Sequence, residues 1–350
     1  MTTIKPIANG GRANLLSGGE KMSKPRVFVT RKIAQEALDM IAGVTEMEIW
    51  EDKLPPPRQV LIKKVQDIEG LLSLLTEKVD RGLMGAAPRL RVISNMAVGY
   101  DNIDVPEATS RGIVVGNTPG VLTEATADFT FALLLAAARR VVEADAYTRK
   151  GEWKTWGPMV MLGYDVYHAT LGIVGLGRIG TAVAKRAQGF NMQVLYYDQV
   201  RRLQEEKELG LEYISSLLAL LSRADFITLH VSLTAQTHHL ISTAEFAAMK
   251  PTAILINTSR GPVVDQKALY QALKSRQIFA AALDVTEVEP IPSDDPLLTL
   301  DNIIIVPHIA SASITARTKM ATLAAANLIA GLRGEMPPHC VNPEAVRHKG

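Results

Sequence analysis

The chain has 350 residues, a length that favours two domains because a single hydrophobic core rarely serves more than about 250–300 residues. A formal net charge of +2 argues against a nucleic-acid-binding face, and the lone cysteine, Cys340, excludes an internal disulfide framework. No apolar run approaches the roughly 18 residues that a membrane-spanning helix needs. We therefore expect a cytoplasmic protein with no membrane or nucleic-acid partner and no bound metal.

The first part of the chain is predicted to be a tail followed by a parallel α/β unit. Residues 1–22 are rich in Gly, Asn and Ser and lack the apolar core of a signal peptide, so we expect a disordered tail, with Met22 as a candidate native start. From residue 23 to about residue 120, apolar runs alternate with helical patterns, which is typical of a doubly wound sheet. The expected strands are residues 26–30, 46–50, 68–75, 91–96 and 112–115, and the first expected helix is 33–41.

A long helical stretch follows. Residues 121–150 carry an apolar stripe that includes Leu134, Ala137 and Val141, and they end with two basic residues before Gly151. This pattern predicts one long helix that connects two domains.

The strongest signal in the chain is a glycine-rich turn. The apolar run 171–174 is followed by Gly175, Gly177 and Gly180 in the spacing G-x-G-x-x-G, and then by a helical pattern. Glycine is needed for a sharp turn, for close approach of the backbone to a pyrophosphate and for packing of the helix on the strand. The next apolar run ends at Asp198, which can accept hydrogen bonds from an adenosine ribose. A plain strand–turn–helix connection explains this combination less well than a dinucleotide site. The predicted contacts are Gly175, Leu176, Gly177, Arg178, Ile179, Gly180 and Asp198.

The second half repeats the alternation of strands and helices. Strands are expected at residues 171–174, 192–197, 225–230, 253–257, 279–283 and 303–306, and a last helix at about 313–332. Three polar stretches follow strand ends and contain Arg260, Glu289 and His308. Ligands bind beyond the carboxyl ends of strands in open parallel sheets. Each residue alone has an ordinary structural explanation, but their shared placement predicts a catalytic set.

The sequence resembles the D-isomer-specific 2-hydroxyacid dehydrogenase family, most closely its glyoxylate/hydroxypyruvate reductases, from Pro25 to about Pro337. The matching motifs are residues 97–104, 121–128, 175–180, 257–261, 283–290 and 307–309. The resemblance implies a Rossmann cofactor domain, residues 121–306, inserted into a flavodoxin-like substrate domain made of residues 23–120 and 307–337. Residues 338–350 would form a C-terminal tail. It also implies a homodimer built through the cofactor domains.

The family's catalytic positions match Arg260, Glu289 and His308. A guanidinium fork suits a 2-keto acid because it can hold the carboxylate and polarise the carbonyl. Histidine is the usual proton donor near neutral pH, and a neighbouring carboxylate favours its imidazolium form. The resemblance therefore implies reduction of a small 2-keto acid, glyoxylate or hydroxypyruvate, by NAD(P)H.

The resemblance also implies further contacts. Substrate contacts would be the backbone at Val98 and Gly99, with Leu75, Arg260 and Trp156, the last from the neighbouring subunit; interface packing explains Trp156 equally well. Further cofactor contacts would be Thr126, Thr258, Ser259, Asp284, His308 and Ala310. Asp284 could instead be a loop cap, and Thr126 could bond to its own helix backbone.

Other residues have less specific interpretations. His230 is expected to meet the adenosine only through its backbone, and His238 and His239 to be solvated. Glu287 could be confused with Glu289, but only Glu289 precedes the proline of the motif.

Alternatives remain open for the substrate. A phosphoglycerate dehydrogenase of the long type is a less favoured alternative, because such enzymes carry a further C-terminal domain. A phosphite dehydrogenase is also less favoured, because those enzymes have a lysine where this chain has Val98. A dehydrogenase that acts on a bulkier 2-keto acid is another candidate. A dinucleotide-sensing corepressor of the same fold is the alternative from another functional class.

The sequence favours NADH over NADPH. The carboxylate of Asp198 would repel the 2′-phosphate of NADP. Arg201 and Arg202 could oppose this effect, although Glu205 and Glu206 are placed to pair with them along a helix.

Overall fold

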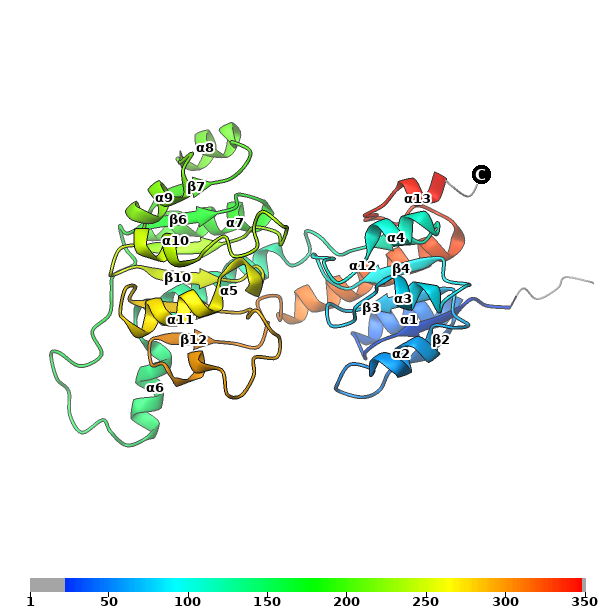
Figure 1. Ribbon diagram of the computed structural model, residues 1–350, viewed down its shortest axis with the longest axis horizontal. Helices are drawn as coiled ribbons and strands as arrows, with labels where there is room; N and C mark the ends of the chain where they lie inside the picture. The colour runs from blue at the N-terminus through cyan, green and yellow to red at the C-terminus, as the bar shows by residue number, and fades with distance from the viewer. Residues whose placement is uncertain (1–22, 348–350) are drawn as a thin grey trace, which may run out of the picture.

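The computed structural model describes residues 23–347, so the expected N-terminal tail of residues 1–22 lies outside the described residues. Two parallel sheets, each covered by helices, stand side by side (Figure 1). The predicted fold class, two doubly wound α/β units, is confirmed. Among the described helices, none combines the length and the apolarity that a membrane span requires.

The first sheet has five parallel strands in the order β2-β1-β3-β4-β5. Strands β3 and β4 are fully buried, as their apolar runs predict. The elements of this unit are β1 (Arg26–Val29), α1 (Gln35–Val44), β2 (Glu46–Ile49), α2 (Arg58–Lys64), β3 (Gly70–Ser73), α3 (Arg81–Gly85), β4 (Val92–Asn95), α4 (Val105–Ser110) and β5 (Val114–Gly116).

The second sheet has seven parallel strands in the order β12-β11-β10-β9-β6-β7-β8. The chain runs outward from β6 through β7 to β8 and then returns to β9, so the strand order reverses between β6 and β9. Ligands bind at such a reversal, beyond the carboxyl ends of the strands. The elements are β6 (Thr170–Val174), α7 (Arg178–Ala187), η1 (Gln188–Phe190), β7 (Gln193–Tyr197), α8 (Leu203–Leu209), β8 (Glu212–Tyr213), α9 (Leu217–Arg223), β9 (Phe226–Leu229), α10 (Thr243–Ala248), β10 (Ile254–Asn257), η2 (Gly261–Val263), α11 (Gln266–Lys274), β11 (Ala280–Leu283), η3 (Pro296–Thr299) and β12 (Ile303–Ile305).

The connecting stretch is two helices rather than the one long helix predicted. Helix α5 (Thr123–Ala138) ends at Arg139, and α6 (Val141–Arg149) starts after Arg140, whose φ is +53°. The carbonyl of Ala138 accepts a hydrogen bond from the N–H of Tyr164 at 2.9 Å. A returning segment therefore takes the place of the next helical turn, and the apolar pattern alone could not reveal this.

The end of the chain returns to the first sheet. Helix α12 (Ile314–Arg333) packs against α1, β3 and β4, and a Cβ on Gly331 would lie 2.5 Å from the side chain of Val92. The part of the expected C-terminal tail that the structure describes, residues 338–347, contacts the first unit: the N–H of Val341 donates to the carbonyl of Val115 at 2.8 Å. Asn342 is buried, and its Oδ1 accepts the N–H of Val115 at 2.7 Å. A short helix, α13 (Glu344–Arg347), follows.

Candidate active site

The glycine turn has the geometry that its spacing predicts. Gly175 has a φ of +96°, and a Cβ there would lie 2.9 Å from the carbonyl carbon of His230. A Cβ on Gly180 would lie 2.2 Å from the carbonyl oxygen of Gly175, which explains the third glycine. Around Gly177 there is open space, and α7 starts at the next residue, Arg178. An open backbone turn at the positive end of a helix suits the pyrophosphate of a dinucleotide.

Asp198 lies beside this turn. Its Oδ2 accepts the N–H of Leu176 at 2.7 Å, and its Oδ1 accepts the N–H of Val200 at 3.1 Å. These two bonds hold the carboxylate at the end of β7, where an adenosine ribose would lie. Arg201 pairs with Glu206 through two bonds of 2.9 Å, not with the residue four positions on, and it lies over the ring of Tyr213.

A cleft of about 400 Å³ lies between the two sheets. It brings together residues that the chain holds far apart, among them most of the predicted site. The predicted residues that line it are Leu75, Val98, Gly99, Thr126, Ile179, Thr258, Ser259, Arg260, Asp284, His308 and Ala310. Trp156 lies outside the cleft of its own chain and is 80% exposed.

Arg260 reaches across the cleft from the end of β10. Its Nε donates to Oδ1 of Asp101 at 3.1 Å, and its Nη1 donates to the carbonyl of Ser259 at 2.9 Å. Its Nη2 lies so close to Gly99 that a Cβ on that glycine would be 1.7 Å away. The guanidinium therefore rests directly on the backbone turn of Val98 and Gly99.

His308 and Glu289 form a hydrogen-bonded pair. Nδ1 of His308 lies 2.8 Å from Oε2 of Glu289, and both side chains are partly exposed. Nε2 is then the ring nitrogen that can face a substrate. Asp284 is nearly fully buried, and its carboxylate accepts the N–H groups of Ile309 and Ala310. It therefore acts as the loop cap that the sequence left open, and burial raises its pKa.

Two cleft residues have buried side-chain nitrogens with no partner among residues 23–347. Both ring nitrogens of His230 are of this kind, and burial lowers its pKa to about 3, so the imidazole is neutral near pH 7. Nε of Arg317, on α12, is also buried without a hydrogen-bond partner among these residues. Burial lowers the pKa of this guanidinium as well. From the sequence, His230 was assigned only a backbone contact, and Arg317 was not named. A basic residue among the alanines of the last helix was the available signal for Arg317.

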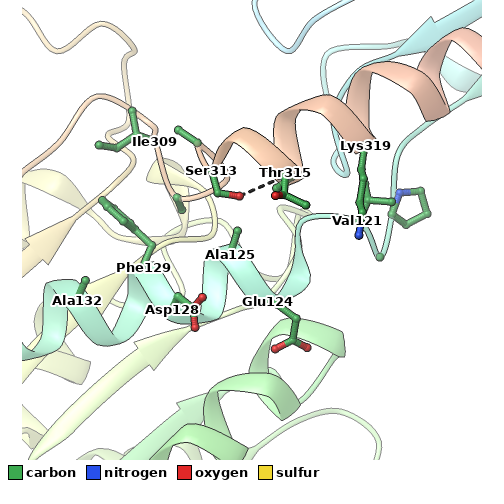
Figure 2. A pocket seen from close by; sticks show the side chains of 15 residues that line it. Val121, Glu124, Ala125, Asp128, Phe129, Ala132, Ile309, Ser313, Thr315 and Lys319 are labelled. Atoms are coloured by element: carbon green, nitrogen blue, oxygen red, sulfur yellow. Dashed lines mark hydrogen bonds between the residues drawn. The ribbon is translucent and has the colours of Figure 1, made fainter. Parts of the chain in front are cut away.

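A second hollow of about 810 Å³ lies where the two units join, between the starts of α5 and α12 (Figure 2). Glu124 and Asp128 lie on its α5 side and Lys319 on its α12 side. Both acids are bonded to Arg186. This hollow is larger than the cleft, but Arg260 and His308 line the cleft and not the hollow, and Glu289 is bonded to His308, so we assign the chemistry to the cleft.

No three His, Cys, Asp or Glu side chains within residues 23–347 come together as a metal site requires.

Known proteins match this chain closely. The model of the D-isomer specific 2-hydroxyacid dehydrogenase, NAD binding domain, matches residues 131–310. A glyoxylate reductase of Korarchaeum cryptofilum is 60% identical, with 93% of this chain and 98% of that protein covered. Another, of Thermococcus litoralis, is 53% identical, with 92% and 98% covered.

Solved structures agree. An NADPH-dependent glyoxylate/hydroxypyruvate reductase of Sinorhizobium meliloti, in complex with NADP and malonate, has a TM-score of 0.80 and 34% identity, with 92% of this chain and 98% of that chain covered. A protein of Thermus thermophilus has a TM-score of 0.85 and 46% identity, with 90% and 99% covered. The resemblance drawn from the motifs is thus confirmed, and the chain is an NAD(P)-dependent enzyme of the D-isomer specific 2-hydroxyacid dehydrogenase family.

Proposed function

We propose that this enzyme reduces glyoxylate to glycolate, accepts hydroxypyruvate as a second substrate, and uses NADH in preference to NADPH. The observation that carries the proposal is the meeting of Arg260 with the His308–Glu289 pair at one cleft beside the glycine turn. Relatives up to 60% identical carry the name glyoxylate reductase, which supports the choice of substrate.

Arg260 and the turn at Val98 and Gly99 would bind the substrate carboxylate. The carbonyls of these two residues accept hydrogen bonds from the side-chain amides of Asn117, at 2.8 Å, and Asn95, at 3.1 Å. The N–H groups of the same two residues donate to no acceptor within residues 23–347. Two free amides next to a guanidinium fork make a suitable carboxylate site.

His308 would donate the proton. As the carbonyl carbon becomes an alcohol carbon, its oxygen gains a proton, and an imidazolium held by Glu289 is suited to supply it. The partner on Nδ1 orients the ring so that Nε2 faces the substrate oxygen. Arg260 would polarise the same carbonyl from the other side.

Residues 121–306 would hold the cofactor, and residues 23–120 with 307–337 would bind the substrate. The open turn at Gly177 and the start of α7 fit a pyrophosphate, and Asp198 fits two ribose hydroxyls. When bound, the reduced cofactor supplies the hydride. The fixed carboxylate of Asp198 and the pairing of Arg201 with Glu206 both support a preference for NADH.

A homodimer is part of this proposal. Helix α6 and the segment that follows it extend away from the second sheet as an arm, residues 141–162 (Figure 1). The arm exposes large apolar side chains, including Trp153, Trp156 and Met159, at 62%, 80% and 75%. A cluster of this kind needs a covering surface, and a second copy with its own arm would supply one. Trp156 would then reach the partner's cleft. Light scattering of the wild type tests the dimer, and the KM for glyoxylate of Trp156→Ala, compared with wild type, tests the contact with the partner's cleft.

Steady-state kinetics with glyoxylate, hydroxypyruvate, pyruvate and phenylpyruvate, each with NADH and with NADPH, test the function. We expect the highest kcat/KM for glyoxylate or hydroxypyruvate with NADH. A higher value for phenylpyruvate would overturn the substrate assignment, and a higher value with NADPH would overturn the cofactor preference alone.

A further inference from the structure

The loop after β9 makes a contact that the sequence did not predict. Nε2 of His239 is hydrogen-bonded to Oε1 of Glu287, so this histidine, which was expected only to be solvated, also has a protein partner. The two side chains are 38% and 27% exposed. Glu287 lies two residues before Glu289, in the segment that follows β11. The contact therefore joins the loop after one strand to the segment that carries the partner of His308.

The backbone around His239 is attached to the segment that follows Arg260. The N–H of His239 donates to the carbonyl of Pro262 at 2.8 Å. Further along, the N–H of Ile241 donates to the carbonyl of Val263 at 3.1 Å, and the carbonyl of Ile241 accepts the N–H of Asp265 at 2.9 Å. His239 is thus attached by backbone hydrogen bonds to the residues directly after Arg260, the proposed substrate clamp.

The backbone around Glu287 leads to the proton donor. The N–H of Glu287 donates to Oε1 of Gln266 at 3.1 Å, and the N–H of Thr286 lies 3.3 Å from Oε1 of Glu289. Thr286 also packs on Gly261, where an added Cβ would lie 1.8 Å from the carbonyl oxygen of Thr286. The segments that carry Arg260 and Glu289 are therefore in direct contact. The hydrogen bond between His239 and Glu287 is a second link between these segments.

We propose that His239 and Glu287 are positioning residues that hold the Glu289 segment against the Arg260 segment and so set the spacing between clamp and proton donor. This inference rests on the proposed reduction. A small keto acid must meet Arg260 and His308 at the same time, and an ångström of misplacement can reduce a rate about 100-fold. Supporting hydrogen bonds of this kind keep reacting groups in place.

The test is a double-mutant cycle of His239→Ala and Glu287→Ala, with His239→Gln as the conservative variant. The matched control is Gln236→Ala, because Gln236 is exposed in the same loop and lies outside the pair. In each single alanine variant we expect kcat for glyoxylate to fall and its KM to rise, roughly 5- to 20-fold in kcat/KM. The KM for NADH should stay within about twofold, because the glycine turn is untouched. The double variant should be no worse than either single variant, because both remove the same bond.

His239→Gln should recover much of the activity, because a glutamine amide can still donate to Glu287. Unchanged kinetics in His239→Ala with an active wild type would overturn the inference alone. Additive losses, an equal loss in Gln236→Ala, or an equal rise in the KM for NADH would also overturn it, because each indicates an effect that does not come from the His239–Glu287 bond. A wild type that turns over no 2-keto acid would overturn the proposed function and this inference together.

Discussion

Asp284 holds the backbone of His308 in a left-handed conformation. His308 has a φ of +53°, and its N–H donates to the carbonyl of Asp284 at 2.9 Å. The Asp284 carboxylate accepts the next two N–H groups, those of Ile309 at 2.6 Å and Ala310 at 3.0 Å. A left-handed conformation costs a residue with a side chain about 1–2 kcal/mol, so it persists only where its surroundings impose it. Asp284 therefore decides the direction in which the imidazole leaves the chain.

Asp284→Asn should lower kcat because an amide offers one oxygen where the carboxylate offers two, so one N–H loses its acceptor. We expect a loss of roughly 10-fold or more from the displaced His308. Burial raises the pKa of Asp284, so the wild-type carboxylate gains its proton at a higher pH than an ordinary aspartate, whose pKa is about 3.9. The wild-type kcat should then fall on acidification as Asp284 gains its proton, and Asp284→Asn should lack this fall. Profiles of kcat between pH 4 and 8 check this, and parallel profiles would contradict it.

His308→Ala should lower kcat by roughly 10²–10⁴ with the affinity for NADH unchanged, because only the proton donor is removed. Glu289→Gln keeps the shape but replaces the carboxylate bonded to Nδ1 of His308, so the ring is held less firmly and kcat should fall as well, by less than in His308→Ala. Turnover kinetics measure kcat, and NADH fluorescence titration measures the affinity for the cofactor. A near-normal kcat in His308→Ala would exclude it as the donor.

Gly99→Ala should act on the clamp without unfolding the protein. The new Cβ would lie 1.7 Å from Nη2 of Arg260, and a flexible side-chain end is the part that can move. We expect the same effect as Arg260→Lys, which keeps the charge and loses the fork: a KM for glyoxylate raised roughly 10-fold or more, and a lower kcat. Gly43→Ala is the matched control, because nothing lies within 4 Å of a Cβ there. If only the affinity for NADH changed, Arg260 would belong to the cofactor site.

Asp198→Gly should narrow or reverse the preference for NADH. The carboxylate held by Leu176 places a like charge where the 2′-phosphate of NADPH would lie. Its removal should raise kcat/KM for NADPH and lower it for NADH, because two ribose hydroxyls lose their acceptor. The ratio of the two kcat/KM values, compared with wild type, measures the effect. A wild type already faster with NADPH would show that Arg201 or Arg202 outweighs Asp198.

Much of the fold follows from local patterns. Alternating apolar runs predicted the parallel strands, because a strand buried on both faces must be apolar along its length. Local signals also set helix ends. The capping box of Ser242 and Glu245 lies at the start of α10, and Gly334 lies at the end of α12. The break at Arg140 did not follow, because a segment that returns more than twenty residues later causes it.

The sequence by itself determined the glycine turn, and it named candidate residues that lie together at the cleft. The turn at Gly175 is a local backbone requirement, and strand ends of one parallel sheet necessarily meet at one edge. Only the tertiary structure decided that Arg260 rests on Gly99, that Asp284 turns inward to hold His308, and that His239 pairs with Glu287. These contacts join segments from 24 to 161 residues apart, and they depend on how two sheets and their loops pack, which no local pattern of side chains encodes.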